Sequence, residues 1–364
     1  MSRLLEYLLG ANEFSYKEMV SKNKKAVALI SGGLDSMLAA RVIKDQGVHL
    51  EGLNFFTGFC VEGHTHAIRN NRAGKRNNAL WVAEQLGIRL HIIDVIEEYK
   101  DIVINPRHGY GAHLNPCLDC KSFMVGKARL WMEEHEFDFI VTGEVLGQRP
   151  MSQRRATFPI VQRESGAGDL LLRPLCAQSQ LPTKPEREGW VDREKLFNFS
   201  GRSRKPQINL AKALKIRDFS QPAGGCCFLT DANYSAKMKD MWRTRGTKDY
   251  DLDDIMLLKV GRHLRPSQDF KMIIARDEGE TNFLMGYRNR FHHLLMTSHG
   301  GPITMLQGDT NKIDLPFAAR IAARFGQGRN ARKVSFLAAG PRMLEKQLTV
   351  SPLRTDQILS EWYL

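Results

Sequence analysis

Apolar and polar residues follow one another along the first half of the chain in the order expected of an α/β fold. Short apolar runs with β-branched or aromatic members predict strands at residues 26–30, 48–56, 89–95, 137–144 and 170–176. Amphipathic stretches predict helices at residues 34–43, 76–86 and 121–134. Because strands that alternate with helices form a parallel sheet covered on both faces, we predict a Rossmann-like α/β domain over residues 26–180.

The remainder of the chain divides into three further segments. Residues 1–25 have the pattern of a helical lead-in, and residues 181–245 form an extension with an irregular part, a helix at 207–215 and a glycine-rich turn. From about residue 250, apolar pieces at 255–260, 270–275 and 282–285 predict strands. Basic stretches at 317–328 and 342–364 predict helices. We therefore predict a smaller, basic α+β domain over residues 246–364.

The first predicted strand runs into the sequence Ser-Gly-Gly-Leu-Asp-Ser at residues 31–36. A strand, a glycine-bearing turn and a helix start form an anion-binding cradle, because unpaired N–H groups and the helix dipole face the turn. An ordinary strand-to-helix turn with a capping serine is the alternative. Ligands of parallel sheets bind beyond the carboxyl ends of the strands. We therefore expect residues 54–57, Asp94, Gly143 and Glu144 to border the same crevice.

Charge and composition change the picture in one respect. The formal net charge is +13, the isoelectric point is about 9.5, and hydrophobic residues make up 42% of the chain. This balance favours a polyanionic partner, nucleic acid above all. No stretch has the ~18 to 20 apolar residues that a membrane helix needs, so we expect no membrane partner. The N-terminal residues lack a convincing cleavage site, and we expect a cytoplasmic protein.

Six cysteines, at positions 60, 117, 120, 176, 226 and 227, form two clusters. Cys117 and Cys120 make a C-x-x-C motif at a predicted helix start, where a helix dipole stabilises a thiolate. The motif fits half of a zinc site, a redox pair, part of an iron–sulfur cluster or a chance occurrence. Cys226 and Cys227 follow a flexible Gly-Gly turn. We expect Cys60 and Cys176, which lie at strand ends among apolar residues, to be buried structural thiols.

These motifs resemble those of a known enzyme group. The sequence at 31–36 is similar to the PP-loop of the ATP pyrophosphatases, which implies that the turn grips pyrophosphate and that Asp35 helps hold Mg²⁺. Asn-Pro-Cys-x-x-Cys at 115–120 and Gly-Gly-Cys-Cys at 224–227 resemble the tRNA 2-thiouridylases. The stretch at 142–153, which contains Gly-Glu-x-Leu-Gly-Gln at 143–148, is similar to that of the tRNA 4-thiouridine synthetases. The zinc-ribbon cysteine pairs of the archaeal-type 2-thiouridine synthetases are absent.

The resemblance implies ATP-dependent thiolation of a tRNA uridine, in which ATP adenylates the carbonyl oxygen and sulfur then displaces AMP. It implies catalytic roles for Asp35, Cys117 and Cys227. The residues implied to contact ATP are Ser31, Gly32, Gly33, Leu34, Asp35, Ser36, Asn54, Phe55, Gly143 and Glu144. Cys117, Cys120 and Cys227 (or Cys226) would hold a 4Fe-4S cluster; a persulfide relay between two cysteines is the alternative.

Three questions about partners stay open at this point. Residues 259–266 and 287–293 mix basic and aromatic side chains, as RNA-binding surfaces do, and residues 257–280 resemble the small RNA-binding domain of ribosome-quality-control proteins. We expect tRNA as partner, with inorganic sulfide or a persulfide carrier as sulfur donor, and leave homodimer formation open. The alternatives are a PP-loop enzyme for a small molecule and an RNA-binding protein with a vestigial nucleotide site.

Overall fold

The computed structural model describes residues 24–60, 77–216, 218–219, 227–309 and 311–364. The chain divides into two compact units, of which the first contains residues 1–60 and 76–226 and the second contains residues 61–75 and 227–364. The predicted helical lead-in and Cys226 lie outside the described residues.

The first unit is built on a five-stranded parallel sheet with strand order β3-β2-β1-β4-β5. Ala26 in the central strand pairs with Leu50 on one side and with Phe139 on the other. Its strands are β1 (Lys25–Leu29), β2 (His49–Phe56), β3 (Leu90–Asp94), β4 (Phe139–Val141) and β5 (Leu171–Leu172). This sheet confirms the predicted Rossmann-like fold class.

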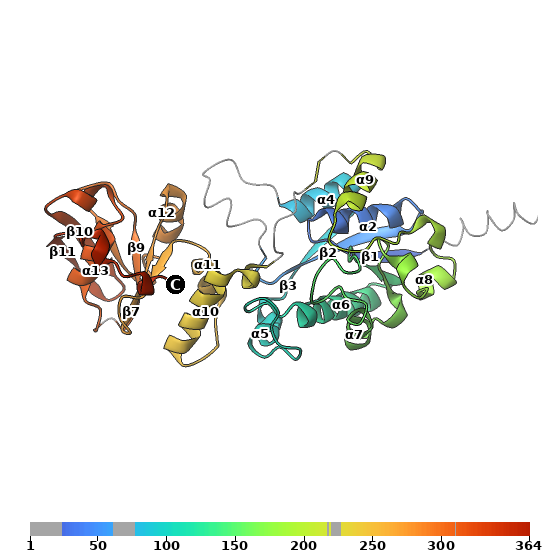
Figure 1. Cartoon of the computed structure of the whole chain (residues 1–364), viewed down its shortest axis with the longest axis horizontal. Coiled ribbons are helices and arrows are strands. Elements are labelled where there is room, and N and C mark those ends of the chain that lie inside the picture. Colours follow the sequence, from blue (N-terminus) through green and yellow to red (C-terminus); the bar gives the residue numbers. More distant parts are fainter. Residues whose placement is uncertain (1–23, 61–76, 217, 220–226, 310) are drawn as a thin grey trace, which may run out of the picture. The chain divides into compact units, whose positions relative to one another are not determined.

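Helices cover both faces of this sheet (Figure 1). One layer contains α2 (Leu34–Lys44), α4 (Asn78–Leu86) and α9 (Lys205–Ala213), and α2 packs against both of the others. The other layer contains α5 (Ile96–Ile104), α6 (Cys117–Glu134) and α7 (Phe158–Glu164), with α6 between its neighbours. The short helix α8 (Lys184–Arg187) follows the fifth strand. Since both faces are covered, the central strand is fully buried, and Ala26 and Val27 have no exposed surface.

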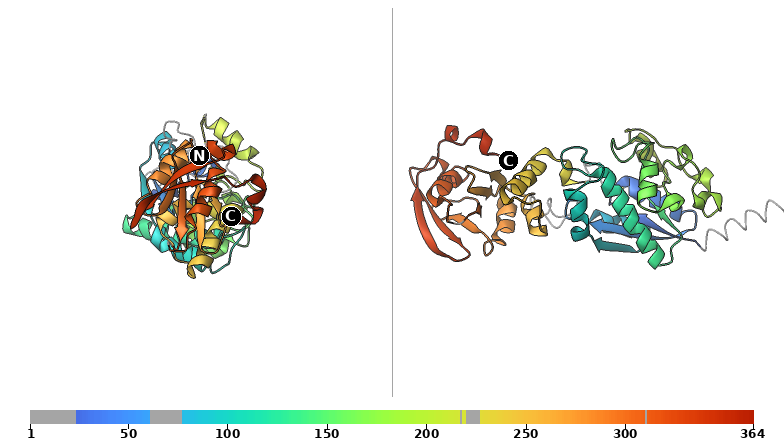
Figure 2. Two further views of the ribbon diagram at one scale, coloured as in Figure 1. Left: turned by 90° about the vertical axis from the view of Figure 1, so that its left-hand side faces the viewer. Right: turned by 90° about the horizontal axis from the view of Figure 1, so that it is seen from below.

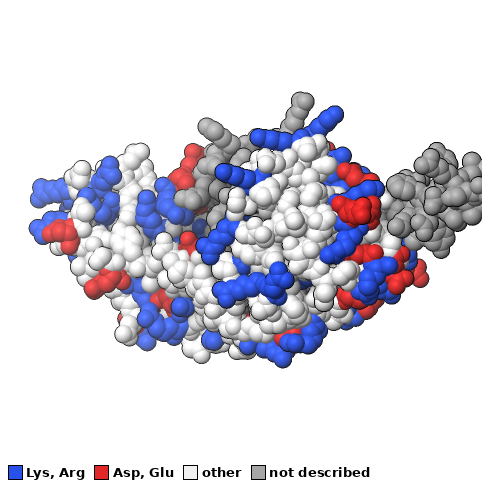
Figure 3. All heavy atoms as spheres, turned by 45° about the vertical axis from the view of Figure 1, so that its right-hand side comes forward, with Lys and Arg blue, Asp and Glu red and all other residues white. Residues whose placement is uncertain are grey.

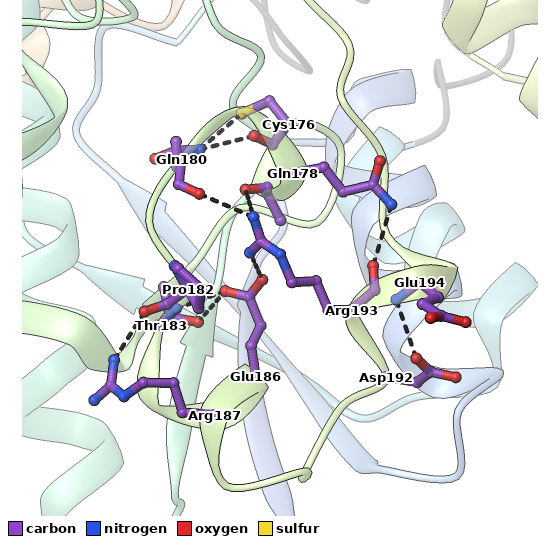
Figure 4. A network of polar contacts seen from close by, with 11 residues as sticks. Cys176, Gln178, Gln180, Pro182, Thr183, Glu186, Arg187, Asp192, Arg193 and Glu194 are labelled. Atoms are coloured by element: carbon purple, nitrogen blue, oxygen red, sulfur yellow. Dashed lines mark hydrogen bonds and ion pairs between the residues drawn. The ribbon is translucent and has the colours of Figure 1, made fainter.

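The segment after β5, which the sequence left irregular, is held by polar contacts around Arg193 (Figure 4). The Arg193 guanidinium donates to the Glu186 carboxylate and to the carbonyl oxygens of Ala177 (3.2 Å) and Gln180 (2.9 Å). The same glutamate accepts from the Thr183 N–H at 2.7 Å in a capping box at the start of α8. The buried Glu186 carboxylate and Arg193 therefore link the short helical turns of this part of the chain.

The second unit is a six-stranded antiparallel sheet with strand order β11-β10-β8-β9-β7-β6 (Figure 2). Its strands are β6 (Arg262–Leu264), β7 (Phe270–Ile274), β8 (His292–Met296), β9 (Thr304–Gly308), β10 (Val334–Gly340) and β11 (Met343–Val350). Its helices are α10 (Ala232–Arg245), α11 (Leu252–Leu257), α12 (Glu278–Met285) and α13 (Leu315–Ala323). Two apolar cores lie on its two faces, one with α13 and the other with residues of α11 and α12. The predicted smaller α+β fold is confirmed.

Three element predictions in the second unit were wrong. Residues 255–260 and 282–285 lie largely in the helices α11 and α12, each of which starts at an aspartate side chain that accepts from a backbone N–H three residues on. These caps outweigh short apolar runs that fit either structure. Residues 342–364 do not form basic helices; β11 occupies Met343–Val350 after a tight turn.

Candidate functional site

The turn between β1 and α2 is organised by Ser36, which is 6% exposed. Its hydroxyl donates to the Gly33 carbonyl oxygen at 2.9 Å and accepts from the Ser31 N–H at 3.3 Å. Gly32 has a φ of 80°, a conformation that favours glycine, and Gly33 is the N-cap of α2 without a side-chain cap. The first N–H groups of α2 are therefore left available to an anion at the mouth of the turn.

Gly143 lies against the backbone of this turn. A Cβ atom at Gly143 would come within 2.5 Å of the Asp35 carbonyl carbon and 2.5 Å of the Ser36 nitrogen. Only glycine allows the end of β4 to approach the start of α2 so closely. The structure thus brings together the two predicted motifs at residues 31–36 and 143–148.

Asp35 projects from the first turn of α2 and is held on one side only. Its Oδ2 atom accepts from the Gln148 amide at 2.7 Å, and a guanidinium nitrogen of Arg204 lies 4.0 Å from the same oxygen. Gln148 is held in turn by the amide of Gln207, which donates to its side-chain oxygen at 3.0 Å. The Oδ1 atom of Asp35 is buried without a hydrogen-bond partner among the described residues. A buried, unpaired carboxylate oxygen beside an anion cradle fits a ligand of a divalent cation.

One loop connects this aspartate with the C-x-x-C motif. Four residues after Gln148, the Ser152 hydroxyl accepts from the Cys117 thiol at 3.1 Å. Because an extended chain advances at most ~3.6 Å per residue, the Cα atoms of Gln148 and Ser152 are no more than roughly 14 Å apart. Cys117 and Cys120 are both half-buried and lie one turn apart at the start of α6. The turn at residues 31–36 and the thiol pair are therefore both in contact with the loop at residues 148–152.

Glu144 lies in a buried ion pair. Its Oε2 atom accepts from Arg173 Nε at 3.1 Å and from the Thr142 hydroxyl at 2.9 Å, with both charged side chains at most 2% exposed. Burial raises the pKa of Glu144, but the positive charges of Lys121 and Arg173 and the two hydrogen bonds outweigh it, so that the net pKa is lowered. The Arg173 guanidinium also stacks 4.0 Å from the Phe158 ring. Glu144 is thus an anion that supports the site from beneath.

The other predicted site residues have distinct positions. Asn54 donates to the Ile30 carbonyl oxygen at 2.7 Å and fixes the end of β1, whereas Phe55 and Leu34 are buried in the core. Cys227 belongs to the second unit, where its thiol accepts from the Leu229 N–H at 3.4 Å, so its position relative to Cys117 is not defined.

The two remaining cysteines differ in burial. Cys176 is fully buried, and burial raises the pKa of its thiol to about 12. It donates to the Glu144 carbonyl oxygen at 3.3 Å and is a structural thiol as expected. Cys60 is half-buried rather than buried, and its sulfur lies 3.7 Å from the Thr57 hydroxyl.

Two separate regions of the chain are similar to known protein families. Residues 24–159 match the family described as tRNA methyl transferase HUP domain, and residues 261–363 match the NFACT protein RNA binding domain. The tRNA-specific 2-thiouridylase MnmA of Sulfurimonas denitrificans is 32% identical over 128 residues, which are 34% of this chain and 35% of that protein. The MnmA of Pelobacter propionicus is 34% identical over 106 residues, which are 28% and 27% of the two chains.

Over the matched residues, the first unit is thus similar to the tRNA-specific 2-thiouridylases. The chain spans about a third of the length of the curated relatives it matches. A solved 4-thiouridine synthetase–RNA complex with bound ATP has 20% identity and a TM-score of 0.34, covering 65% of this chain and 52% of that one. Among the described residues, no helix is long and apolar enough to cross a membrane.

Sequence reasoning missed three residues of the site. Gln148 stands inside the recognised 143–148 motif, but its contact with Asp35 joins positions 113 residues apart. Gln207 lies in α9 and Arg204 is the N-cap of that helix, both beyond the matched family region. No local pattern marks a buried glutamine as part of a distant site.

Proposed function

We propose that this protein is an ATP-dependent tRNA uridine thiolase, with the nucleotide and sulfur chemistry in the first unit and RNA binding in the second. The observation that carries the proposal is the loop that contacts Asp35 through Gln148 and Cys117 through Ser152. A PP-loop ligase for a small molecule has no need for a thiol pair at this place. The intact turn and the unpaired Asp35 oxygen speak against a vestigial site.

The chemistry follows from these groups. The uridine carbonyl oxygen attacks the α-phosphorus of ATP, the bond to the β-phosphate breaks, and pyrophosphate leaves into the N–H cradle of residues 31–36. Asp35, whose other oxygen is held by Gln148, would bind Mg²⁺, and the ion would neutralise charge on the phosphates. A hydrosulfide sulfur then attacks the activated carbon, and AMP departs with the former carbonyl oxygen. The sum of these steps is uridine, ATP and hydrosulfide giving thiouridine, AMP and pyrophosphate.

For sulfur delivery we favour a 4Fe-4S cluster over a persulfide relay. Cys117 and Cys120 fit two of its ligands, being half-buried thiols one helical turn apart. The resemblance implies Cys227 or Cys226 as the third thiol, and the described residues contain no group of three or more potential ligands. The cluster would supply an iron at which sulfide is held.

Anaerobically purified protein should contain iron and acid-labile sulfide. Both should be lost with Cys120→Ala and kept with Cys60→Ala. A colourless, fully active protein would reject the cluster.

The second unit would supply RNA contacts. It matches an RNA-binding domain family over nearly its whole sheet. Lys and Arg side chains are spread over both units on the face shown in Figure 3, with fewer Asp and Glu among them. Such a distribution suits a partner that presents phosphates over an extended surface, as tRNA does.

The decisive test uses the full chain, purified without oxygen, with unmodified tRNA, ATP and sulfide. We expect AMP formation that requires the RNA, and a thiolated uridine in the nucleosides of the digested product. AMP formation without RNA would favour the small-molecule enzyme. RNA binding without AMP or thiouridine would favour the vestigial site.

Replacing Gln207 by leucine tests the support of the nucleotide site. The change removes the donor that fixes Gln148 and leaves Asp35 less well oriented. Because one hydrogen bond contributes about 1 kcal/mol, we expect the affinity for Mg²⁺–ATP to fall about fivefold. Calorimetric titration with a non-hydrolysable ATP analogue measures the effect.

The matched control is Gln178→Leu. Gln178 donates to the Arg193 carbonyl oxygen at 3.2 Å in an exposed position of the same unit. Its loss should leave nucleotide affinity unchanged. Equal affinities for both variants would show that Gln207 does not act through Asp35.

A further inference from the structure

The second unit contains a large cavity that the proposed chemistry does not use. It has a volume of about 960 Å³, the upper end of the range for small-molecule sites. The cavity is bordered by the end of α10, by β7 and β9, and by the turn between β10 and β11. Its charged lining is mostly cationic and consists of Arg245, Arg265, Lys271, Arg290, Lys312, Arg342, Asp269 and Asp309.

Three of the lining arginines are neutralised from behind. Arg245 pairs with Asp254 at 2.6 Å, Arg265 with Asp240 at 2.7 Å and Arg290 with Asp251 at 2.7 Å. None of these three aspartates lines the cavity. The carboxylates therefore hold these guanidinium groups in place and balance their charge, so the further positive charge of the lining comes from Lys271 and Arg342, since Lys312 pairs with Asp309.

Lys271 differs from these arginines. It is the second residue of β7 and has 3% of its surface exposed, and its side chain makes no hydrogen bond or ion pair with any described residue. The nearest acid, Asp240, already accepts from Arg265 and Arg243. A buried cation without a partner is costly, by several kcal/mol in typical proteins, and such a group is retained where an anion binds.

The cavity is also lined by an aromatic side chain. Phe291 is half-buried and lines the cavity beside His292, whose pKa burial lowers, so that the imidazole is neutral at physiological pH. An aromatic ring next to buried cations provides what a nucleotide needs, namely a stacking surface for the base and positive charge for the phosphate.

We propose that this cavity holds one nucleoside-monophosphate unit of an RNA strand, with its phosphate beside Lys271 and Arg265 and its base against Phe291. The assignment rests on the RNA-binding role proposed for the second unit and adds a specific point of attachment to it. A free mononucleotide has the same chemistry, and the experiment separates the two sources.

The test compares full-length Lys271→Met with Lys346→Met in binding a short labelled single-stranded RNA. Methionine matches the lysine stem and removes only the buried charge, so the variant should fold and melt no lower than the wild type. We expect Lys271→Met to bind about tenfold more weakly and to lower the slope of log affinity against log salt by about 0.7, one phosphate contact on a single strand. Lys346 is exposed on β11, and its loss should change affinity less than about twofold because an exposed charge is screened.

A pH series gives a second readout. Burial lowers the pKa of Lys271 to about 8; Asp240 opposes this shift, whereas Arg265, Arg245 and Lys237 add to it. The lysine is charged below that pH, so wild-type affinity should fall as the pH rises through about 8. Burial also lowers the pKa of Lys237 to about 8, but this lysine is present in both variants and contributes equally to their pH dependence. Lys271→Met should therefore show a weaker pH dependence than Lys346→Met.

Each result separates the cavity from RNA binding in general. Equal losses for both variants would overturn the cavity site and leave RNA binding intact. If the wild-type protein bound no RNA, titration with uridine monophosphate would test whether the cavity binds a free nucleotide instead. Binding that Lys271→Met abolishes would support the site with a free nucleotide as its ligand, and binding equal in both proteins would overturn it.

Discussion

Replacing Gly143 by alanine is expected to lower AMP formation at least 100-fold while leaving the protein folded. The new methyl group would lie 2.5 Å from two backbone atoms, the Asp35 carbonyl carbon and the Ser36 nitrogen, which is too close for nonbonded atoms. Since backbone cannot rotate away as a side chain can, the turn and the end of β4 must separate by about 1 Å. Misplacement of this size costs on the order of 100-fold in rate. Release of AMP from labelled ATP, together with ATP affinity, measures the loss.

Gly126→Ala provides the matched control. Gly126 lies inside α6, and an added Cβ would meet its nearest neighbour, the Ser165 carbonyl oxygen, at an ordinary 3.6 Å. An alanine in a helix interior stabilises by about 1 kcal/mol relative to glycine. We therefore expect full activity and an equal or higher melting temperature. Retention of activity within a few-fold in Gly143→Ala would show that the turn does not bind nucleotide in this conformation.

The sequence was informative about the first unit because its inner strands β1 and β4 are buried on both faces. The run at 26–30 is apolar throughout and is followed by glycines and a helix start, which favours a central strand. The 255–260 and 282–285 pieces contain Lys259 and Asn282, lack such flanking signals and do not distinguish strand from helix. Their aspartate caps, Asp251 and Asp277, stand in the sequence and would have decided for helix.

The site was predictable only as far as its motifs are local. The turn at 31–36 combines strand, glycines and helix start within a few residues, so its geometry follows from the sequence. By contrast, the contacts from Gln148 to Asp35 and from Gln207 to Gln148 join residues 113 and 59 positions apart. The same holds for Glu144, whose partner Arg173 stands 29 positions away in the sequence. Tertiary structure alone determines which polar residues meet in the interior.

The pair Glu144–Arg173 gives the largest expected effect on stability. Arg173→Met would leave the Glu144 carboxylate buried with only the Thr142 hydroxyl as a hydrogen-bond donor. Breaking a buried pair by removing one partner typically costs about 3–5 kcal/mol, because the remaining charge is uncompensated. We expect the free energy of unfolding to fall by that amount, which chemical denaturation measures. Lys121 also lowers the pKa of Glu144, so the loss should lie toward the lower end.

The double variant Glu144→Gln/Arg173→Met distinguishes charge from packing. A neutral glutamine needs no counter-ion, so the double variant should be more stable than Arg173→Met alone. Acid provides an independent check. Because the pKa of Glu144 is lowered in the folded protein, its contribution is present above its ordinary value of 4.5 and is lost as the pH falls through the folded value. The wild type should therefore lose stability in acid more steeply than the double variant, and equal acid sensitivity would mean that the ion pair does not stabilise the fold.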